Sequence, residues 1–244
     1  MKKIEFKKEF WCIVTARRNS KSIKRKNLVK IKGKELIKYS FDVIKKVNKI
    51  KKTIVTTDDE KIKKISTKYN YFVIDRKKSL SGDKVNSVNV IMDVLKKSLI
   101  EFGYLPSYFF LIQPTSPFLQ NEHLTKLINV LSSNKKYKSA QTIIKVPHQY
   151  HALNQRFFKK KQTGFIEEKK RLSMHNKQTK PKMFAYGNLI VTNTKLFLKN
   201  KNFFLKPSFG MLIPNIYGFD LDNKYDLKIA SKILSKPLSY YEKD

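Results

Sequence analysis

Cysteine, arginine and long apolar runs are all scarce in this chain of 244 residues. The single cysteine, Cys12, excludes a disulfide framework and a zinc site built on cysteines. No run of about 18 apolar residues is present, so we expect no transmembrane helix. The basic start lacks the apolar segment of a signal peptide, and we therefore expect a soluble, cytoplasmic protein. No paired spacing that would predict a metal site is found among the four histidines, which are His123, His148, His151 and His175.

Positive charge is abundant, with 53 basic residues against 19 acidic ones and a formal net charge of +34. Only six of the basic residues are arginine, the side chain whose planar fork best reads base edges. The lysines are spread over the whole chain and form no basic block, which argues against a dedicated nucleic-acid surface. A non-catalytic basic protein that binds nucleic acid stays an alternative. The charge itself favours anionic small substrates.

Two apolar patterns alternate along the chain and predict its fold class. Short runs typical of buried strands lie at 10–14, 52–57, 71–74, 108–112, 140–144, 188–192 and 210–213. Helical spacing or helix-start signals lie between them, near 36–47, from 58 onward, and at 88–99, 121–131, 195–199 and 225–234. This alternation predicts an α/β fold with a doubly wound, mostly parallel sheet covered by helices on both faces. Such sheets bind ligands beyond the carboxyl ends of their strands, which singles out the loops after Val14, Thr57, Ile74 and Ile112.

The alternation breaks down between residues 146 and 182, where short apolar pairs stand among long polar stretches. Thr163-Gly164 lies between two such pairs and suggests a hairpin turn. We interpret 146–182 as an inserted arm, used in forming a homodimer, within a single domain that covers residues 1–244.

The loop after the first strand, residues 15–28, has the side chains that a nucleotide triphosphate needs. It carries no glycine-rich phosphate motif, but Arg17, Lys21 and Lys26 can neutralise phosphate oxygens and Ser20 adds a hydroxyl. The amide of Asn27 can both donate and accept, which suits the edge of a base. From the residues alone, an ordinary solvated basic loop is an equally good interpretation.

Several stretches of the chain resemble one enzyme family in order and spacing. The loop matches the signature A-R-x-x-S-K-x-x-x-x-K-N-L, with Gly33 further on, although Arg18, Asn19 and Ser22 stand where the family often has glycine. Similar stretches follow at 55–59 (V-T-T-D-D), 111–117 (L-I-Q-P-T-S-P) and 219–222 (F-D-L-D). The chain thus resembles the CMP-N-acetylneuraminate synthetases, cytidylyltransferases that activate sialic acids, and the likeness spans about residues 13–234.

The resemblance implies a Rossmann-like nucleotidyltransferase fold and a set of site residues. Arg17 and Lys21 are implied as catalytic. The implied nucleotide-binding residues are Thr15, Ala16, Arg17, Ser20, Lys21, Lys26, Asn27, Arg76 and Ser87. The implied sugar-binding residues are Gln113, Lys177, Gln178, Phe203 and Phe204. Lysine at 177 replaces a family arginine, so bidentate clamping of a carboxylate is lost there. Asp83 also matches a family position, without an assigned role, and Asn188 is a weak sugar-side candidate.

Asp220 and Asp222 are the candidate metal ligands. Residues two apart in an extended segment face the same side, and two carboxylates on one side suit Mg²⁺. The resemblance assigns this pair to the metal, with Mg²⁺ as the cofactor. The alternative is that the pair caps the helix expected to begin near Tyr225. Asp58 and Asp59 are a second acidic pair, but their place at a helix start explains them structurally.

The reaction that the resemblance implies is transfer of CMP from CTP to the anomeric hydroxyl of a sialic-acid-like nonulosonic acid, with release of pyrophosphate. N-acetylneuraminic, legionaminic and pseudaminic acids are all open as the sugar. One alternative of another class is a GT-A-like glycosyltransferase that uses its D-x-D on a nucleotide sugar. It would release no pyrophosphate from CTP.

Overall fold

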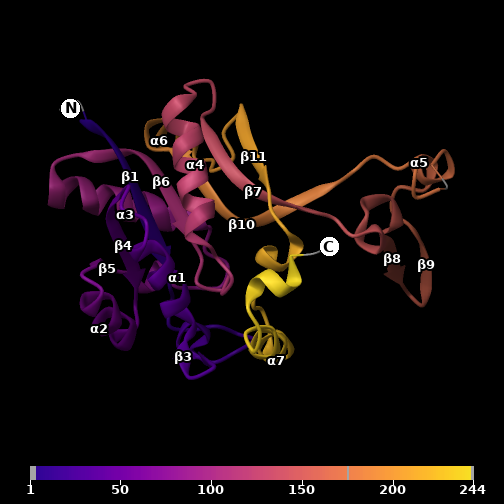
Figure 1. Ribbon diagram of the computed structural model, residues 1–244, viewed down its shortest axis with the longest axis horizontal. Coiled ribbons are helices and arrows are strands. Elements are labelled where there is room, and N and C mark those ends of the chain that lie inside the picture. The colour runs from indigo at the N-terminus through magenta and orange to yellow at the C-terminus, as the bar shows by residue number, and fades with distance from the viewer. Residues whose placement is uncertain (1–3, 175, 243–244) are drawn as a thin grey trace.

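A seven-stranded sheet forms the centre of the molecule in the computed structural model, which describes residues 4–174 and 176–242 and so leaves out His175 (Figure 1). Its strand order is β11-β7-β10-β6-β1-β4-β5. Only β10 runs antiparallel to its neighbours, β6 and β7, and the other four pairings are parallel. The strands are β1 (Phe6–Thr15), β4 (Ile50–Thr57), β5 (Phe72–Asp75), β6 (Leu105–Ile112), β7 (Ser139–Lys145), β10 (Phe184–Asn193) and β11 (Ser208–Leu212).

Helices pack on both faces of this sheet, which confirms the predicted doubly wound, mostly parallel fold. One face is covered by α1 (Leu36–Lys45), α2 (Glu60–Lys68) and α4 (Asn121–Ser133), and the other by α3 (Ser87–Phe102) and α6 (Thr194–Asn200). The last helix, α7 (Lys224–Ile233), packs with a small antiparallel pair of strands, β2 (Lys30–Ile31) and β3 (Lys34–Glu35), near the loop after β1. Within the described residues, no helix has the length and apolarity needed to cross a bilayer.

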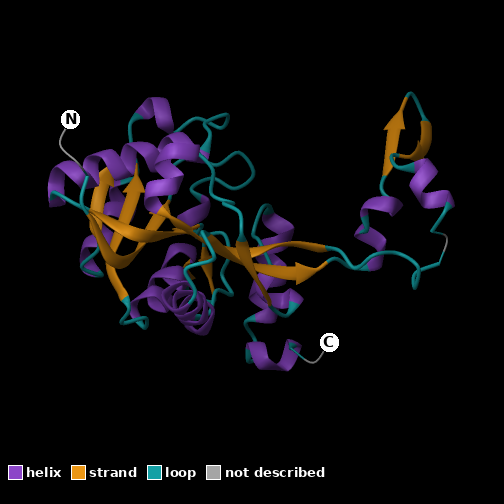
Figure 2. Ribbon diagram, turned by 90° about the horizontal axis from the view of Figure 1, so that it is seen from above, coloured by secondary structure: helices purple, strands orange, loops and turns teal. Residues whose placement is uncertain are grey.

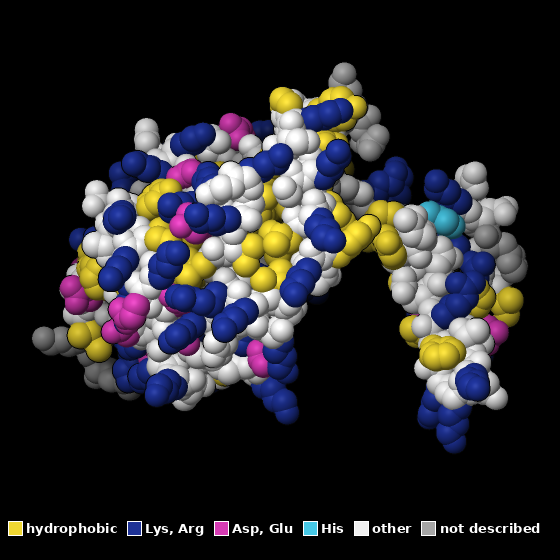
Figure 3. All heavy atoms as spheres, turned by 90° about the horizontal axis from the view of Figure 1, so that it is seen from below, with side chains coloured by type: hydrophobic (Ala, Val, Ile, Leu, Met, Phe, Trp, Pro, Cys, Tyr) yellow, Lys and Arg dark blue, Asp and Glu magenta, His cyan; other side chains and the backbone are white. Residues whose placement is uncertain are grey.

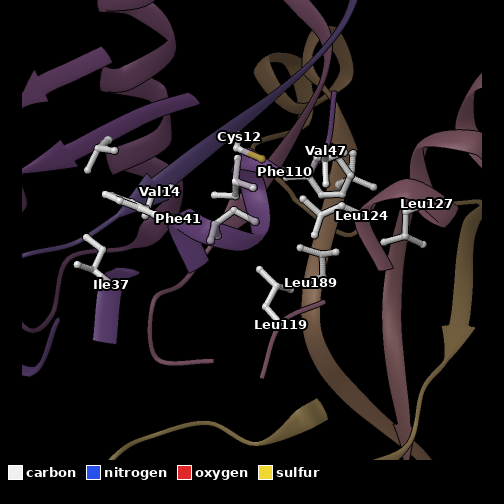
Figure 4. Close-up of a cluster of buried hydrophobic side chains, with 14 of the residues drawn as sticks. Cys12, Val14, Ile37, Phe41, Val47, Phe110, Leu119, Leu124, Leu127 and Leu189 are labelled. Carbon is white, nitrogen blue, oxygen red and sulfur yellow. The ribbon is translucent and has the colours of Figure 1, made fainter. Parts of the chain in front are cut away.

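The alternation of side chains along β1 explains the two cores. Cys12 and Val14 point into the layer formed with α1, where Phe41 packs against them (Figure 4). Trp11 and Ile13 point to the opposite face, toward α3. All four are fully buried, as expected for the central strand of a parallel sheet covered on both faces. Burial raises the pKa of the Cys12 thiol, which therefore behaves as a small apolar residue.

The arm extends away from the sheet (Figure 2) and contains β8 (Arg156–Lys159), β9 (Gln162–Phe165) and α5 (Glu168–Leu172). The expected hairpin is present, but Thr163-Gly164 lies inside β9, so the predicted position of the turn is wrong. The turn is made by Lys160 and Lys161, which both have left-handed backbones with φ of 49° and 65°. Gly164 instead faces Phe157 across the hairpin, where a Cβ atom would come within 2.8 Å of the phenyl ring.

Lysine and arginine side chains are scattered over the body and over the arm on the face shown in Figure 3. This agrees with the even spread of lysine along the sequence. Net charge therefore does not by itself identify a functional surface on this protein, and the contacts of individual cations have to be considered.

A candidate nucleotide cleft at the carboxyl ends of the strands

A cleft of about 280 Å³ lies beyond the carboxyl ends of the central strands. It is located where β1 has β6 on one side and β4 on the other, the point at which the strand order of the sheet reverses. It is lined by Thr15, Arg17, Asn19, Ser20, Lys26, Asn27, Arg76, Gly82, Asp83, Val85, Ser87, Gln113, Pro114, Thr115, Asp220 and Asp222. The loop after β1 and the distant aspartate pair therefore share one cleft.

The loop after β1 is held by the two aspartates that follow β4. The backbone N–H of Arg18 donates to Asp58 Oδ1 at 2.6 Å. Arg25 donates two hydrogen bonds to the carboxylate of Asp59, from Nε to Oδ2 at 3.0 Å and from Nη2 to Oδ1 at 2.7 Å. Arg25 itself adopts a left-handed backbone with φ of 52°, a conformation that costs a non-glycine residue energy. Ionic contacts thus fix the course of a loop that has no glycine of its own.

Asp59 also begins α2, as the sequence predicted, by accepting from the N–H groups of Lys61 and Ile62. Burial acts to raise the pKa of Asp59, but the hydrogen bonds from Arg25 and the backbone outweigh it, and the pKa lies below its ordinary value. The second acidic pair is therefore engaged by the loop and by a helix start. It is not among the residues that line the cleft.

The two predicted catalytic cations meet at one carboxylate in the cleft. Arg17 Nη1 lies 2.6 Å from Asp83 Oδ1, and Lys21 Nζ lies 3.3 Å from Asp83 Oδ2. Lys21 is otherwise exposed to solvent, whereas Arg17 is largely covered. Asn27 is buried and donates from Nδ2 to the carbonyl of Arg17 at 3.0 Å, so it also fixes the loop.

Arg76 joins this cluster from the end of β5. Its backbone N–H donates to the carbonyl of Thr57 at 3.0 Å, and its Nε donates to the carbonyl of Leu80 at 2.8 Å. Burial lowers the pKa of Arg76, with the nearby charge of Arg17 adding to the effect. Ser87 begins α3 at the same edge of the cleft. Ala16 is buried, and its backbone N–H donates to the carbonyl of Thr56.

The predicted metal pair lies on the opposite wall, just before α7. Burial raises the pKa of Asp220, and the neighbouring charge of Asp222 raises it further. Lys26 Nζ lies 3.2 Å from Asp222 Oδ1 and donates to the carbonyl of Leu221 at 2.9 Å. A hydrogen bond from Thr115 and the charge of Lys26 offset the rise in pKa only in part, and two neighbouring carboxylates of this kind fit a divalent cation.

The alternative interpretation of this pair, that it caps the last helix, is wrong. The residue that caps α7 is Asn223, whose side chain accepts from the N–H groups of Tyr225 and Asp226, while Asp226 reaches back to the N–H of Asn223. Asp220 and Asp222 are thus not used as caps, and both line the cleft.

The predicted sugar-side residues are distributed over three places. Gln113 lines the cleft at the end of β6. Phe203 is buried and packs against Phe197 and Phe109 in the core, whereas its neighbour Phe204 is 47% exposed. Lys177 and Gln178 do not line this cleft. They line a separate, larger pocket of about 1160 Å³ at the base of the arm, together with Lys145 and residues before the C-terminus.

One residue near the cleft was missed by the sequence analysis. Tyr186 on β10 packs edge to face with Phe204, with ring centroids 6.0 Å apart. Burial raises the pKa of the Tyr186 phenol, and the charge of Asp220 raises it further. Tyr186 and Phe204 thus form a partly exposed aromatic surface. An aromatic residue two positions before Asn188, just ahead of the strand predicted at 188–192, was the signal available in the sequence.

Asn188 is buried, so the structure gives this weak sugar-side candidate an internal role. Its Nδ2 donates to the carbonyl of Tyr217 at 2.7 Å, and its Oδ1 accepts from Thr142 Oγ1 at 3.0 Å. These bonds connect β7 and β10 to the short helical turn at 215–218 that leads into Asp220. Gly187 is required beside them, because a Cβ atom there would lie 2.6 Å from Thr142 Oγ1.

Comparisons with known proteins agree with this geometry. Residues 11–220 match the family model described as cytidylyltransferase. The chain is 26% identical over 92% of its length to an N-acylneuraminate cytidylyltransferase of Escherichia coli O18:K1:H7, of which it covers 52%. It is 29% identical over 92% of its length to a pseudaminic acid cytidylyltransferase of Campylobacter jejuni, of which it covers 95%.

Among solved structures, a CMP:2-keto-3-deoxy-manno-octonic acid synthetase complexed with CTP is similar in fold, with a TM-score of 0.67 and 12% identity over 93% of this chain and 98% of that one. The chain spans about half the length of the N-acylneuraminate cytidylyltransferases that it matches and nearly all of the pseudaminic acid enzyme.

Proposed function

The chain belongs to the cytidylyltransferase family, and from this premise we propose that it transfers CMP from CTP to the anomeric hydroxyl of a nonulosonic acid and releases pyrophosphate. The observation that carries the proposal is the single cleft in which Arg17 and Lys26 from the loop after β1 meet Asp220 and Asp222. Relatives named for N-acylneuraminic, pseudaminic and N,N'-diacetyllegionaminic acids support this class of sugar. A cytoplasmic location, where CTP is available, is part of the proposal.

In this reaction the anomeric oxygen attacks the α-phosphorus of CTP, the bond to the pyrophosphate oxygen breaks, and the hydroxyl proton is lost. Negative charge builds on the α-phosphate and on the leaving pyrophosphate. Arg17 and Lys21 neutralise that charge, and because it is largest in the transition state their effect falls mainly on kcat. Asn27, with the backbone at Thr15 and Ala16, recognises cytosine, and Ser20, Arg76 and Ser87 hold the rest of the nucleotide.

Asp220 and Asp222 are proposed to hold Mg²⁺. Bound there, the ion would supply positive charge to phosphate oxygens and polarise the attacking hydroxyl. Two carboxylates alone do not complete a magnesium shell, so substrate oxygens and water are expected to provide the remaining ligands. Lys26, which contacts Asp222, is well placed to move its ammonium from that carboxylate to phosphate when the metal and nucleotide bind.

The sugar acid is proposed to lie between Gln113 and the aromatic surface of Tyr186 and Phe204, next to the metal pair. Lys177 and Gln178, on the arm, line a different pocket of the same chain. We therefore propose a homodimer in which the arm of one copy brings these two side chains to the cleft of the other. Exposed apolar side chains on the arm, among them Phe158 at 79% and Leu172 at 61%, support burial against a second copy.

The decisive experiment measures pyrophosphate release from CTP with Mg²⁺ and, separately, N-acetylneuraminic, legionaminic and pseudaminic acids. We expect release with at least one of these acids, and none with UTP in place of CTP. Release of no pyrophosphate with any of the sugars would contradict the proposal. Hydrolysis of a nucleotide sugar without pyrophosphate would favour the glycosyltransferase alternative.

Action of the arm in trans can be tested by mixing two inactive variants, Asp222→Asn and Lys177→Ala. A mixed dimer would contain one cleft with both side chains intact, so about a quarter of wild-type activity should return after subunit exchange. Lys169→Ala, another exposed arm lysine, is the matched control and should stay active. No gain on mixing, or full activity of Lys177→Ala alone, would contradict the trans arrangement.

A further inference from the structure

Asp83 makes the most conspicuous contact in the cleft that the proposed reaction does not use. One oxygen of its carboxylate lies 2.6 Å from Arg17 Nη1, and the other lies 3.3 Å from Lys21 Nζ. Asp83 follows a single helical turn at 78–80 and precedes α3, in a segment with no regular secondary structure. Arg17 Nη1 also reaches the carbonyl of Ser81 in this segment, at 3.4 Å.

The position of this carboxylate conflicts with the binding of a triphosphate. A phosphate group held by Arg17 and Lys21 would present two anionic oxygens to the same two cations that Asp83 now occupies. An anionic carboxylate and a phosphate cannot occupy that position together, because they compete for the same donors and repel each other. The two cations hold the pKa of Asp83 below its ordinary value, so the carboxylate is charged at neutral pH.

Exposure indicates that this contact can be broken. The side chains of Asp83 and Lys21 are 36% and 80% exposed, and ion pairs that retain this much water are weak. Asp83 also stands in a segment that is not part of the sheet or of a long helix, so the carboxylate can swing away without disturbing the core.

We propose that Asp83 is a displaceable counter-ion, which holds Arg17 and Lys21 together at the cleft edge in the free enzyme and returns to them as pyrophosphate leaves. The proposal rests on the proposed function, since it takes the two cations to be the phosphate-binding pair. In the free protein, Asp83 prevents Arg17 and Lys21 from repelling each other out of position. After the reaction, it competes with pyrophosphate for them and so favours product release in a protein of high positive charge.

A counter-ion and a purely structural residue make opposite predictions for Asp83→Asn. Asparagine keeps the size of the side chain and one oxygen acceptor, but it removes the charge. If Asp83 competes with phosphates, the variant should bind pyrophosphate and CTP more tightly, by roughly 3- to 10-fold, the range expected from one or two weak ion pairs. If Asp83 only supports the loop, the same variant should bind both anions more weakly.

The test is calorimetric binding of pyrophosphate, and separately of CTP, to the full-length wild-type protein and to Asp83→Asn, without sugar. Asp83→Glu, which keeps the charge, should restore binding close to that of the wild type. Glu60→Gln removes an equal charge from an exposed acid that is paired with Lys63 outside the cleft, and it should leave both affinities unchanged. In turnover, inhibition by added pyrophosphate should become stronger in Asp83→Asn.

Unchanged or weaker pyrophosphate binding by Asp83→Asn would overturn the counter-ion role, whatever the turnover. An equal gain in Glu60→Gln would also overturn it, because the effect would then come from overall charge. The proposed function fails separately: if no sugar acid supports turnover while Asp83→Asn still binds pyrophosphate more tightly, the cleft holds the counter-ion but not the proposed reaction.

Discussion

The loop after β1 and the arm are both rich in cations, yet their surroundings differ. Residues 15–28 contain six basic residues and 146–182 contain ten. In the loop, Arg17, Lys21 and Arg25 each meet a carboxylate that another segment supplies. In the arm, Arg156 and Arg171 instead lie near the ring of Phe165, at 4.4 and 4.3 Å from its centroid.

This difference concerns the acidic side chains, which are scarce in the sequence. With 19 acids for 53 bases, most cations have no carboxylate partner, and those of the loop are paired with Asp59, Asp83 and Asp222 from distant segments. The arm contains cation–π contacts, a hairpin and one local ion pair, Lys170–Glu167, and it leaves apolar side chains exposed. The loop is thus organised for binding a small anion, and the arm for contact with another surface.

The strongest test of the comparison is Lys21→Ala. Loss of a charge that stabilises the transition state should lower kcat by about 100-fold or more at saturating CTP and Mg²⁺. Lys24→Ala, an exposed lysine of the same loop that, unlike Lys21, is not paired with Asp83, is the matched control and should stay within a few-fold of wild type. Steady-state pyrophosphate release measures both. Equal losses in the two variants would show that the loop acts only through its overall charge.

Asp59→Ala should have the next largest effect, on stability. The substitution removes the cap of α2 and the partner of Arg25, and we expect a loss of about 2 kcal/mol in the free energy of unfolding. Asp59→Asn keeps a capping oxygen and should lose less. Urea unfolding followed by circular dichroism measures both. The lowered pKa means that this stabilisation is present above the ordinary aspartate pKa and is lost as the pH falls through the folded-state value. A variant as stable as wild type would remove the anchoring role of Asp59.

Phe158→Asp probes the arm in the same way. In the proposed homodimer Phe158 is buried between two copies, so a charge at this position should raise the dissociation constant of that dimer by about 10-fold or more. The control is Ile100→Asp, which alters an equally exposed apolar side chain on α3, outside the arm. Analytical ultracentrifugation across a concentration series gives both constants. If Ile100→Asp alone weakens the dimer, the interface lies on the body of the molecule.

The smallest expected effect is a gain in stability in Asp220→Asn without Mg²⁺. Because the pKa of Asp220 is raised by burial and by Asp222, its ionised form destabilises the folded protein, and stability falls as the pH rises through the raised pKa. At neutral pH the variant should therefore melt slightly higher, on the order of 1–2 °C, while it loses activity. Differential scanning calorimetry at pH 7 and at pH 4 measures this. A gain that is equal at both pH values would not come from the charge.

Much of the fold follows from periodicity, because central strands buried on both faces read as continuous apolar runs. The run at 10–14 became β1, and the helical spacing at 88–99 became α3. The hairpin in the arm was predicted but its turn was misplaced, because Gly164 is needed for close packing across the strands and the left-handed positions are filled by lysines.

The sequence predicted those candidate site residues that form a pattern within one short segment. The cations of the loop and the spacing of Asp220 and Asp222 are local patterns, and the shared cleft follows from the topology of the sheet. The ion pair of Arg25 with Asp59, 34 residues away, depends on a left-handed backbone at Arg25 that no local sequence pattern predicts. Phe203 and Phe204 are adjacent in sequence, yet one is buried and the other exposed, and only the packing of α6 decides which.

The junction of the arm with the sheet has a consequence for how such proteins can diversify. The chain leaves β7 at Lys145 and returns in β10 at Phe184, and these two residues are cross-strand partners; one step further out, the N–H of Val146 donates to the carbonyl of Met183 at 2.9 Å. A two-residue link at this point would close an ordinary hairpin. The arm can therefore be lengthened, shortened or exchanged for another without shifting the register of β7 or β10, and any such exchange would also replace the side chains that the arm is proposed to bring to the cleft.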